Sequence, residues 1–293
     1  MGRYEKCGQD QPSGFEKIWS RLEFAREKEA NFLNWPNKYR LFDVKVSATT
    51  YDQALAAVAR ATEEGIPGTV THLAVHGLIT ACEDIELREM INSFSMVAPD
   101  GQPVRIALNL LFNTKLPSNV RGSELMLRLC RLAADKNIGI YLYGSHSHVV
   151  NRLAEILHRK FPSLQVVGNE PSIFRRLTPE EDEDLVRRIN NSGAGLVFLG
   201  LGCPLQEIFA FEHQKRINSV QICVGAAFDF LSENKKMAPV WSQQYGLEWL
   251  YRLVHEPRRL WKRYFMTNSI FLRRLLSELL RLRNSNSIKE RLE

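Results

Sequence analysis

Short apolar runs alternate with helix-like segments from residue 41 to residue 224, and this alternation constrains the fold more than any other feature of the chain. We expect strands at residues 41–46, 69–73, 95–98, 138–143, 164–167, 196–199 and 221–224. We expect helices at residues 50–64, 78–92, 123–136, 147–160, 178–190 and 204–215. Strand–helix–strand repeats are typical of parallel sheets whose helices cover both faces. The sequence therefore predicts an α/β fold with a mainly parallel, Rossmann-like sheet.

Three parts follow from the distribution of polar and apolar residues. Residues 1–40 are polar with interspersed aromatics, and we interpret them as an N-terminal extension with one helix around residues 15–31. Residues 41–240 are expected to form the catalytic α/β domain, and 293 residues with 44% hydrophobic content suffice for a sizeable core. Residues 241–293 carry no further strand signal and are expected to form a helical appendage.

The positive charge of the chain is concentrated in this appendage. Residues 252–284 hold nine Lys and Arg against two Glu, so this segment carries +7 while the remainder of the chain carries −1. A local basic segment favours one anionic contact over general nucleic-acid binding, so no nucleic-acid partner is expected. From residue 260 onward, apolar residues recur at helical spacing: Leu260, Trp261, Tyr264, Phe265, Phe271, Leu272, Leu275, Leu276 and Leu279.

A basic amphipathic helix of this kind indicates contact with an anionic membrane surface. The alternative is that the stripe packs on the protein's own core or between subunits, and the two interpretations are compatible. No apolar run approaches the roughly 20 residues that a membrane span needs, and the N-terminus lacks an apolar signal region. We expect a cytoplasmic protein, peripheral on the inner face of the membrane. Homo-oligomerisation remains open.

The five cysteines are scattered and form no CxxC pair, and the histidines form no cluster with metal-ligand spacing. This usage is typical of a reduced protein in the cytoplasm. No Asp-x-Asp pair flanks an apolar strand in the way a metal site for a diphosphate would require. We therefore expect no metal and no cofactor.

One aspartate and five glycines come directly after expected strands. They are Asp100, Gly144, Gly168, Gly200, Gly202 and Gly225. The carboxyl ends of parallel strands share one edge of a sheet, where ligands bind, so this set is expected to converge. Glycine lets backbone approach a ligand closely, and Gly144 and Gly200 are therefore candidate substrate-binding positions. The alternative for each glycine is a simple chain turn.

Asp100 stands in the turn Ala98-Pro99-Asp100-Gly101 and is the candidate catalytic residue. A carboxylate there can act as a general base that removes a proton from an acceptor hydroxyl. Aspartate is also a common turn former, which is the alternative interpretation. His72 lies on or just beyond an earlier strand and is a candidate for hydrogen bonding to a sugar, although a single histidine is more often structural.

The segment from Gly200 to Glu207 is not a dinucleotide-binding fingerprint, because Leu205 occupies the position of the third glycine. It also lacks the lysine of a phosphate-binding loop of the Walker type. Pro204 favours the first turn of a helix, which would place Gln206 and Glu207 where an amide and a carboxylate can bind a base or sugar. For Glu207 the alternative is complementarity to the helix dipole.

Several ordered motifs together resemble one known family. They are residues 84–88, 98–101, 116–122, 141–144, 161–164, 166–168, 200–207, 225–230 and 247–259. Over residues 41–263 the chain resembles the bacterial WecG/TagA/CpsF glycosyltransferases, which add a sugar to a polyprenyl-diphosphate-linked acceptor. The resemblance implies a UDP-sugar donor, inversion at the anomeric centre and no metal.

The resemblance also implies roles for individual residues. Asp100 corresponds to the family's proposed catalytic base, and Asp229 to the aspartate that lines the nucleotide-sugar site. Arg252 and Arg259 correspond to arginines of the C-terminal appendage that hold the acceptor's diphosphate, and Lys262 stands near a third such position. These residues complete the set of expected substrate contacts.

Three departures from the family pattern predict a different donor sugar. His72-Leu73-Ala74 replaces a Thr-Pro-Asn motif at the sugar pocket, or Thr71-His72-Leu73 does if the register shifts by one. Residues 171–174 replace His-Gly-Tyr-Phe near the nucleotide, and residues 237–239 replace Arg-Ala-Pro. We expect a hexose-type sugar such as glucose, or a uronic acid, in place of N-acetylmannosamine.

The expected function is thus an inverting, metal-independent glycosyltransferase of surface or exopolysaccharide synthesis. One alternative is a nucleotide-dependent oxidoreductase on a similar sheet, which the missing glycine fingerprint disfavours. A second alternative is a non-enzymatic adaptor that recruits a partner to the membrane through its basic segment.

Overall fold

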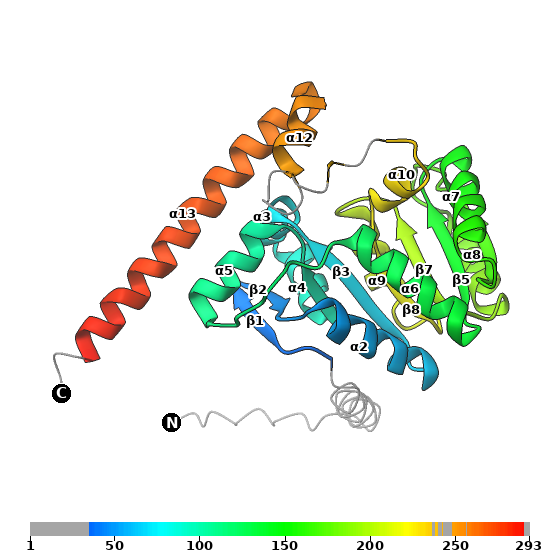
Figure 1. The fold of residues 1–293 in the computed structure, drawn as a ribbon, viewed down its shortest axis with the longest axis horizontal. Coiled ribbons are helices and arrows are strands. Elements are labelled where there is room, and N and C mark those ends of the chain that lie inside the picture. The colour runs from blue at the N-terminus through cyan, green and yellow to red at the C-terminus, as the bar shows by residue number, and fades with distance from the viewer. Residues whose placement is uncertain (1–34, 236–237, 240–241, 243–247, 256, 290–293) are drawn as a thin grey trace, which may run out of the picture. The chain divides into compact units, whose positions relative to one another are not determined.

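A computed structural model describes residues 35–235, 238–239, 242, 248–255 and 257–289 (Figure 1). The chain divides into two units, Met1–Trp35 and Pro36–Glu293, and the fold described below belongs to the second. The helix expected around residues 15–31 lies outside the described residues.

The centre of the second unit is a six-stranded, fully parallel sheet with the strand order β4-β3-β8-β7-β5-β6. Its strands are β3 (Gly68–Leu73), β4 (Met96–Pro99), β5 (Gly139–Gly144), β6 (Val166–Glu170), β7 (Ala194–Gly200) and β8 (Val220–Cys223). Apart from β6, these strands are almost entirely buried, as expected of a sheet covered on both sides. The predicted α/β fold with a mainly parallel sheet is confirmed.

Helices cover both faces of the sheet. In chain order, the helices of this part of the fold are α2 (Tyr51–Glu63), α3 (Val75–Glu83), α4 (Ile85–Ser93), α5 (Gln102–Phe112), α6 (Gly122–Lys136), α7 (Ser147–Lys160), α8 (Pro179–Asn191), α9 (Leu205–His213) and α10 (Ala227–Leu231). Successive residues of a strand point to opposite faces of the sheet. On β3, the Thr71 hydroxyl hydrogen-bonds to a residue of α9, whereas His72 lies against the start of α6, so the two helices cover opposite faces. Helix α6 packs with α2 and α10, and α9 packs with α4.

Residues 41–46 do not form the single strand that was expected. The chain makes an antiparallel hairpin of β1 (Lys38–Leu41) and β2 (Val44–Ser47). Phe42 and Asp43 both have positive φ, which is the geometry of a two-residue hairpin turn. The alternating pattern was correct, but the turn within it was missed because Phe42 is not a typical turn residue.

The helix expected over residues 78–92 is also wrong, because Asp84 divides it into α3 and α4. The Asp84 backbone is extended, and its side chain accepts a hydrogen bond from the Leu87 amide at 3.0 Å, which caps α4. Helix α5 was not expected at all. It begins directly after Gly101 with Pro103 in its first turn and ends at Asn113, which has the left-handed conformation.

Gly168 does not follow its strand, as the sequence had suggested, but lies inside β6. A Cβ atom at this position would come within 2.2 Å of the Tyr141 ring on the neighbouring strand β5. The residue is therefore glycine because an aromatic ring occupies the space, and it is removed from the set of ligand-facing turns.

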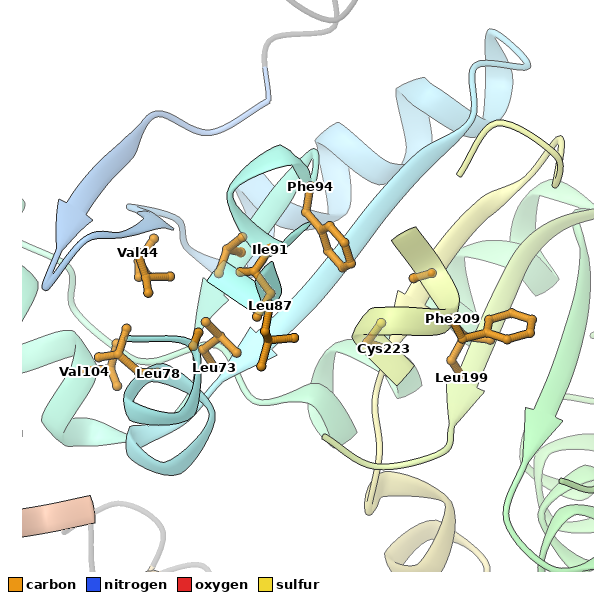
Figure 2. Packing of buried hydrophobic residues seen from close by; sticks show 14 of the residues in the cluster. Val44, Leu73, Leu78, Leu87, Ile91, Phe94, Val104, Leu199, Phe209 and Cys223 are labelled. Atoms are coloured by element: carbon orange, nitrogen blue, oxygen red, sulfur yellow. The ribbon is translucent and has the colours of Figure 1, made fainter. Parts of the chain in front are cut away.

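A cluster of buried hydrophobic side chains connects the sheet to α3, α4, α5 and α9 (Figure 2). Figure 2 shows Leu73, Leu78 and Val104 close together at one end of this cluster, and Leu199 with Phe209 at another. Leu73, Leu78 and Leu199 are completely inaccessible to solvent. Complete burial of such a side chain stabilises a fold by about 1.5–3 kcal/mol, so this packing fixes the strand ends next to α3 and α9.

The C-terminal part is helical, with α12 (Glu248–His255) and α13 (Pro257–Lys289). Helix α13 packs on α3 and α5 of the α/β unit (Figure 1). Phe271 is buried there, with its ring edge-on to Phe42 at a centroid distance of 5.5 Å. Within the described residues, no helix combines the length and apolarity needed to cross a bilayer.

Candidate active site

The strands β5 and β7 are neighbours, and the connections that leave their carboxyl ends run in opposite directions along the sheet. The connection that leaves β5 runs outward to β6, whereas the connection that leaves β7 runs the opposite way to β8. Loops that separate in this manner leave a crevice at the carboxyl ends of the strands, and ligands of open α/β sheets bind there. Gly144 ends β5 and Gly200 ends β7, so the two candidate glycines face each other across this point.

The close approach of these strand ends requires glycine at both positions. A Cβ atom at Gly144 would lie 2.6 Å from the Gly200 carbonyl carbon, and the φ of Gly144 is +129°. A Cβ atom at Gly200 would lie 2.5 Å from the Phe228 ring of α10. The space beside each Cα is therefore filled by protein, and these glycines shape the edge of the sheet itself.

A cavity of about 410 Å³ lies beside the ends of β3 and β4. The α/β unit contributes polar groups to it, including His72, Asp100, Asn119, Arg121 and Cys203. The C-terminal helices contribute an apolar wall that includes Trp249, Tyr264, Phe271 and Leu272. The cavity thus lies between the carboxyl edge of the sheet and the appendage, and it is partly open to solvent.

Asp100 lies at this cavity because it belongs to the turn between the end of β4 and the start of α5. Its backbone amide donates a hydrogen bond to the Leu73 carbonyl at 3.0 Å, which holds the turn between the ends of β3 and β4. Gly101 then adopts a φ of +81°, a conformation favourable only for glycine, and α5 begins. The Asp100 residue is half-buried.

Arg121 and Asn119 were not predicted as site residues, yet both line the cavity with Asp100. The Val120 amide donates to the Pro99 carbonyl at 2.9 Å and so brings their loop to the end of β4. The Arg121 amide donates to the Tyr51 hydroxyl at 3.0 Å. The only sequence signal for this loop was the family motif at residues 116–122, since it has no helical or strand periodicity.

His72 presents an uncharged imidazole to the cavity. Its Nδ1 lies 3.0 Å from the Cys223 carbonyl oxygen, which can only accept, so Nδ1 carries the hydrogen and Nε2 keeps a free lone pair. Nε2 is buried and has no hydrogen-bond partner among the described residues. Burial lowers the pKa of His72 from its usual 6.5 to about 4, although the bond to Cys223 opposes this shift.

This pKa makes the stability of the fold dependent on pH. As the pH falls from 6.5 to about 4, the unfolded chain binds a proton at His72 and the folded chain does not. The free energy of unfolding is therefore expected to fall over this window, by up to about 3 kcal/mol. Urea unfolding at a series of pH values measures the effect. The variant His72→Gln should show a shallower slope, and identical slopes for both proteins would contradict this prediction.

Gln206 and Glu207 begin α9 as expected but lie below the surface. Glu207 is completely buried, and its Oε1 accepts hydrogen bonds from the Thr71 hydroxyl at 2.8 Å and from Gln206 Nε2 at 2.9 Å. Burial raises the pKa of the Glu207 carboxyl, and the bonds from Gln206 and Thr71 oppose that shift. Glu207 thus lies behind the cavity and does not line it.

Asp229 lies on α10, beyond the end of β8. Its Oδ1 accepts a hydrogen bond from Asn234 Nδ2 at 2.8 Å, and its Oδ2 lies 3.8 Å from Lys235 Nζ. Asp229 does not line the cavity that holds Asp100. In the sheet order, β8 and β4 lie on the two sides of β3. The two aspartates therefore occupy separate parts of the carboxyl edge.

The basic residues of the appendage are only partly described. Arg252 lies on α12 and Arg259 on α13, but their side chains are outside the described part of the structure. Lys262 is exposed on α13, with its ammonium 5.7 Å from the centre of the Trp261 ring. Among the residues that are described, no group of three His, Cys, Asp or Glu side chains could hold a metal ion.

The parallel sheet thus gathers a carboxylate, an imidazole and a guanidinium beside one cavity at its carboxyl edge. The model of the glycosyl transferase WecG/TagA/CpsF family matches residues 39–285, and the chain belongs to this family. It is a glycosyltransferase of glycan biosynthesis. This membership sets aside the oxidoreductase and the non-enzymatic adaptor.

One curated relative is the N-acetylglucosaminyldiphosphoundecaprenol N-acetyl-beta-D-mannosaminyltransferase of Bacillus subtilis (strain 168). The two proteins are 30% identical over 185 residues, which covers 62% of this chain and 69% of the relative.

Proposed function

We propose that this glycosyltransferase moves a hexose-type sugar from a UDP-sugar to a polyprenyl-diphosphate-linked saccharide during surface or exopolysaccharide synthesis. Family membership supports the reaction class, and the name of the Bacillus subtilis relative supports the lipid-linked acceptor. The observation that carries the proposal is the cavity itself, because it combines Asp100 with Arg121 and His72 under an apolar wall.

Asp100 serves as the general base in the proposed reaction. Its carboxylate takes the proton of an acceptor hydroxyl while that oxygen bonds to the anomeric carbon of the donor. The bond between the anomeric carbon and the phosphate oxygen breaks at the same time, and UDP leaves with its electron pair. Attack from the side opposite to UDP inverts the anomeric centre.

Guanidinium groups stabilise the phosphate charges in this proposal and make a metal unnecessary. Arg121 already lines the cavity, and a guanidinium can hold two phosphate oxygens at once. Arg252, Arg259 and Lys262 are proposed to hold the diphosphate of the acceptor. Their helices α12 and α13 also supply Trp249 and Tyr264 to the wall of the cavity.

We propose that the nucleotide binds between the carboxyl ends of β5 and β7, beside Gly144 and Gly200. Gln206 contacts the donor from the start of α9, and Asp229 lies on the uridine side. His72 contacts the sugar through the lone pair on Nε2, which accepts a hydrogen bond from a hydroxyl.

A donor screen tests the function directly. The protein is incubated with single UDP-sugars and a polyprenyl-diphosphate-linked N-acetylglucosamine, and UDP release and lipid-linked product are measured with and without EDTA. We expect turnover of a UDP-hexose at an unchanged rate in EDTA. Turnover of UDP-N-acetylmannosamine alone would overturn the proposed sugar, and a rate abolished by EDTA would overturn the metal-free mechanism.

Arg259 offers a test of the acceptor site. A charge-assisted hydrogen bond contributes about 1.5–3 kcal/mol, so Arg259→Ala is expected to raise the KM for the lipid-linked acceptor by roughly tenfold to a hundredfold. Affinity for UDP, measured by titration calorimetry, should stay the same. Arg273→Ala is the control, because Arg273 is exposed further along α13. Equal losses of UDP affinity and acceptor use would contradict the assignment.

We propose a peripheral, cytoplasmic location, and helix α13 supports the membrane contact in this proposal. The apolar stripe of the sequence divides into two faces, since Leu260 and Phe271 are buried against the protein. The other face is exposed and consists of Trp261, Phe265, Leu272, Leu276 and Leu280. Leu272 also lines the cavity, so the exposed apolar face reaches the rim of the site. We propose that this face enters an anionic membrane surface.

The variant Leu276→Asp tests the membrane contact. A charge on the exposed face should weaken binding to vesicles that contain anionic lipid by about tenfold, because it removes apolar burial and repels the head groups. Ser277→Asp is the matched control, since it adds the same charge at the next position, where the helix faces a groove against α5. Co-sedimentation measures both. Equal binding by the two variants would contradict the proposed face.

A further inference from the structure

A small hydrogen-bonded cluster lies buried behind the ligand-facing edge of the sheet. Its centre is Glu207, whose side chain is completely inaccessible to solvent. Thr71 on β3 and Gln206 on α9 both donate to Glu207 Oε1. The Cys223 thiol at the end of β8 donates to the Gln206 main-chain oxygen at 3.4 Å. One carboxyl group thus connects β3, α9 and, through Gln206, β8.

The cluster determines which way the Gln206 amide points. A glutamine amide can exchange its oxygen and nitrogen by a half-turn, and only its partners select one orientation. Glu207 Oε1 is an acceptor here, because it already receives the Thr71 hydroxyl hydrogen. Gln206 must therefore turn Nε2 toward Glu207 and Oε1 away from it.

Gln206 Oε1, which points away from Glu207, lies against the turn after β8. A Cβ atom at Gly225 would come within 3.2 Å of Gln206 Oε1, and glycine leaves this space open. Gln206 Oε1 is buried and has no hydrogen-bond partner within the described residues. A buried acceptor without a partner destabilises the protein unless a donor reaches it, so this atom is suited to an N–H or O–H group of a ligand.

We propose that Glu207 is a positioning residue, which holds the Gln206 amide so that its oxygen is presented to an N–H or O–H group of the donor substrate. This inference rests on the proposed function for the identity of the ligand. In this role Glu207 does not need to contact the substrate itself.

The surroundings of Glu207 indicate that it performs this role as an uncharged acid. Its neighbours are the Thr71 hydroxyl, the Gln206 amide and the thiols of Cys203 and Cys223, and none of them is a cation. Burial raises its pKa, which favours the protonated form. A glutamine at position 207 reproduces the shape and the acceptor oxygen of such an acid, whereas methionine fills the space without any acceptor.

The experiment compares Glu207→Gln, Glu207→Met and Gln206→Ala in donor turnover. We expect Glu207→Gln to keep kcat/KM for the donor within about threefold, and Glu207→Met and Gln206→Ala each to lower it by about tenfold. In the double variant Gln206→Ala/Glu207→Met the two losses should not multiply. Losses that multiply, or a Glu207→Gln variant as impaired as Glu207→Met, would overturn the proposal.

A second readout needs no turnover and so separates this inference from the proposed function. In ¹⁵N NMR spectra, the Gln206 side-chain amide is identified by its disappearance in Gln206→Ala. Its hydrogens should be protected from exchange in the wild type and in Glu207→Gln, and unprotected in Glu207→Met. Protection that persists in Glu207→Met would overturn the positioning role even if no UDP-sugar is turned over. Thermal unfolding of each variant shows whether it is folded.

Discussion

Asp100→Asn is expected to lower the rate of sugar transfer by at least about a hundredfold, since a positioned general base contributes about 10²–10⁴ to a rate. The amide has the shape of the carboxylate but cannot take up a proton from the acceptor hydroxyl. The turn itself should survive, because its hydrogen bond to Leu73 comes from the main-chain amide of Asp100. Turnover under saturating donor and acceptor, together with the melting temperature, measures the effect.

Asp52→Asn is a matched control for this substitution. The Asp52 side chain is 94% exposed at the start of α2 and lies 3.9 Å from Arg128, so the same chemical change should leave turnover intact. Affinity for UDP should be unchanged in both variants. If Asp100→Asn folds normally and turns over at the wild-type rate, Asp100 is not the base.

Gly144→Ala is expected to have the largest effect on stability, a loss of at least about 3 kcal/mol. The new methyl group would lie 2.6 Å from the Gly200 carbonyl carbon. The atoms that it meets belong to the backbone of an adjacent, buried strand and cannot turn aside as a side chain could. The φ of +129° adds strain for any residue with a Cβ atom. Urea unfolding gives the free energy difference directly.

Gly193→Ala separates strain from steric overlap. Gly193 also has a positive φ of +70°, but a Cβ atom there meets no atom within 4 Å. Its cost should be the backbone term alone, about 1–2 kcal/mol. If Gly144→Ala destabilises the protein no more than Gly193→Ala does, the strand ends can separate, and the close contact between β5 and β7 does not fix this edge of the sheet.

Much of the fold could be predicted because the relevant signals are local. Helix α8 is an example, since Thr178 accepts from the Glu181 amide, Glu181 accepts from the Thr178 amide, and Pro179 occupies the first turn. Such capping depends on residues three positions apart in the chain. Where the expectation failed, a two-residue turn at Phe42–Asp43 and the single residue Asp84 interrupted patterns that otherwise continued.

The candidate site was only partly predictable. Asp100 was found because it follows a strand and His72 because it lies near the end of one, and both line the cavity. Arg121 was missed, because it reaches the cavity through the bonds that Val120 and Arg121 make to Pro99 and Tyr51, which lie far from them in sequence. Glu207 was expected to face the substrate, and no local pattern distinguishes a buried carboxyl from an exposed one in the first turn of a helix.

The sequence alone determined the strand and helix alternation, the helix caps, the turn that carries Asp100 and the family to which the chain belongs. These depend on the conformational preferences of neighbouring residues and on ordered motifs. Only the tertiary structure decided that β8 pairs with β3, that the loop of Arg121 lies at the end of β4, and that Glu207 bonds inward to Thr71. Those contacts join residues up to 152 positions apart, as between Gly68 and Val220, and they form through close packing and buried hydrogen bonds that no local stretch of sequence specifies.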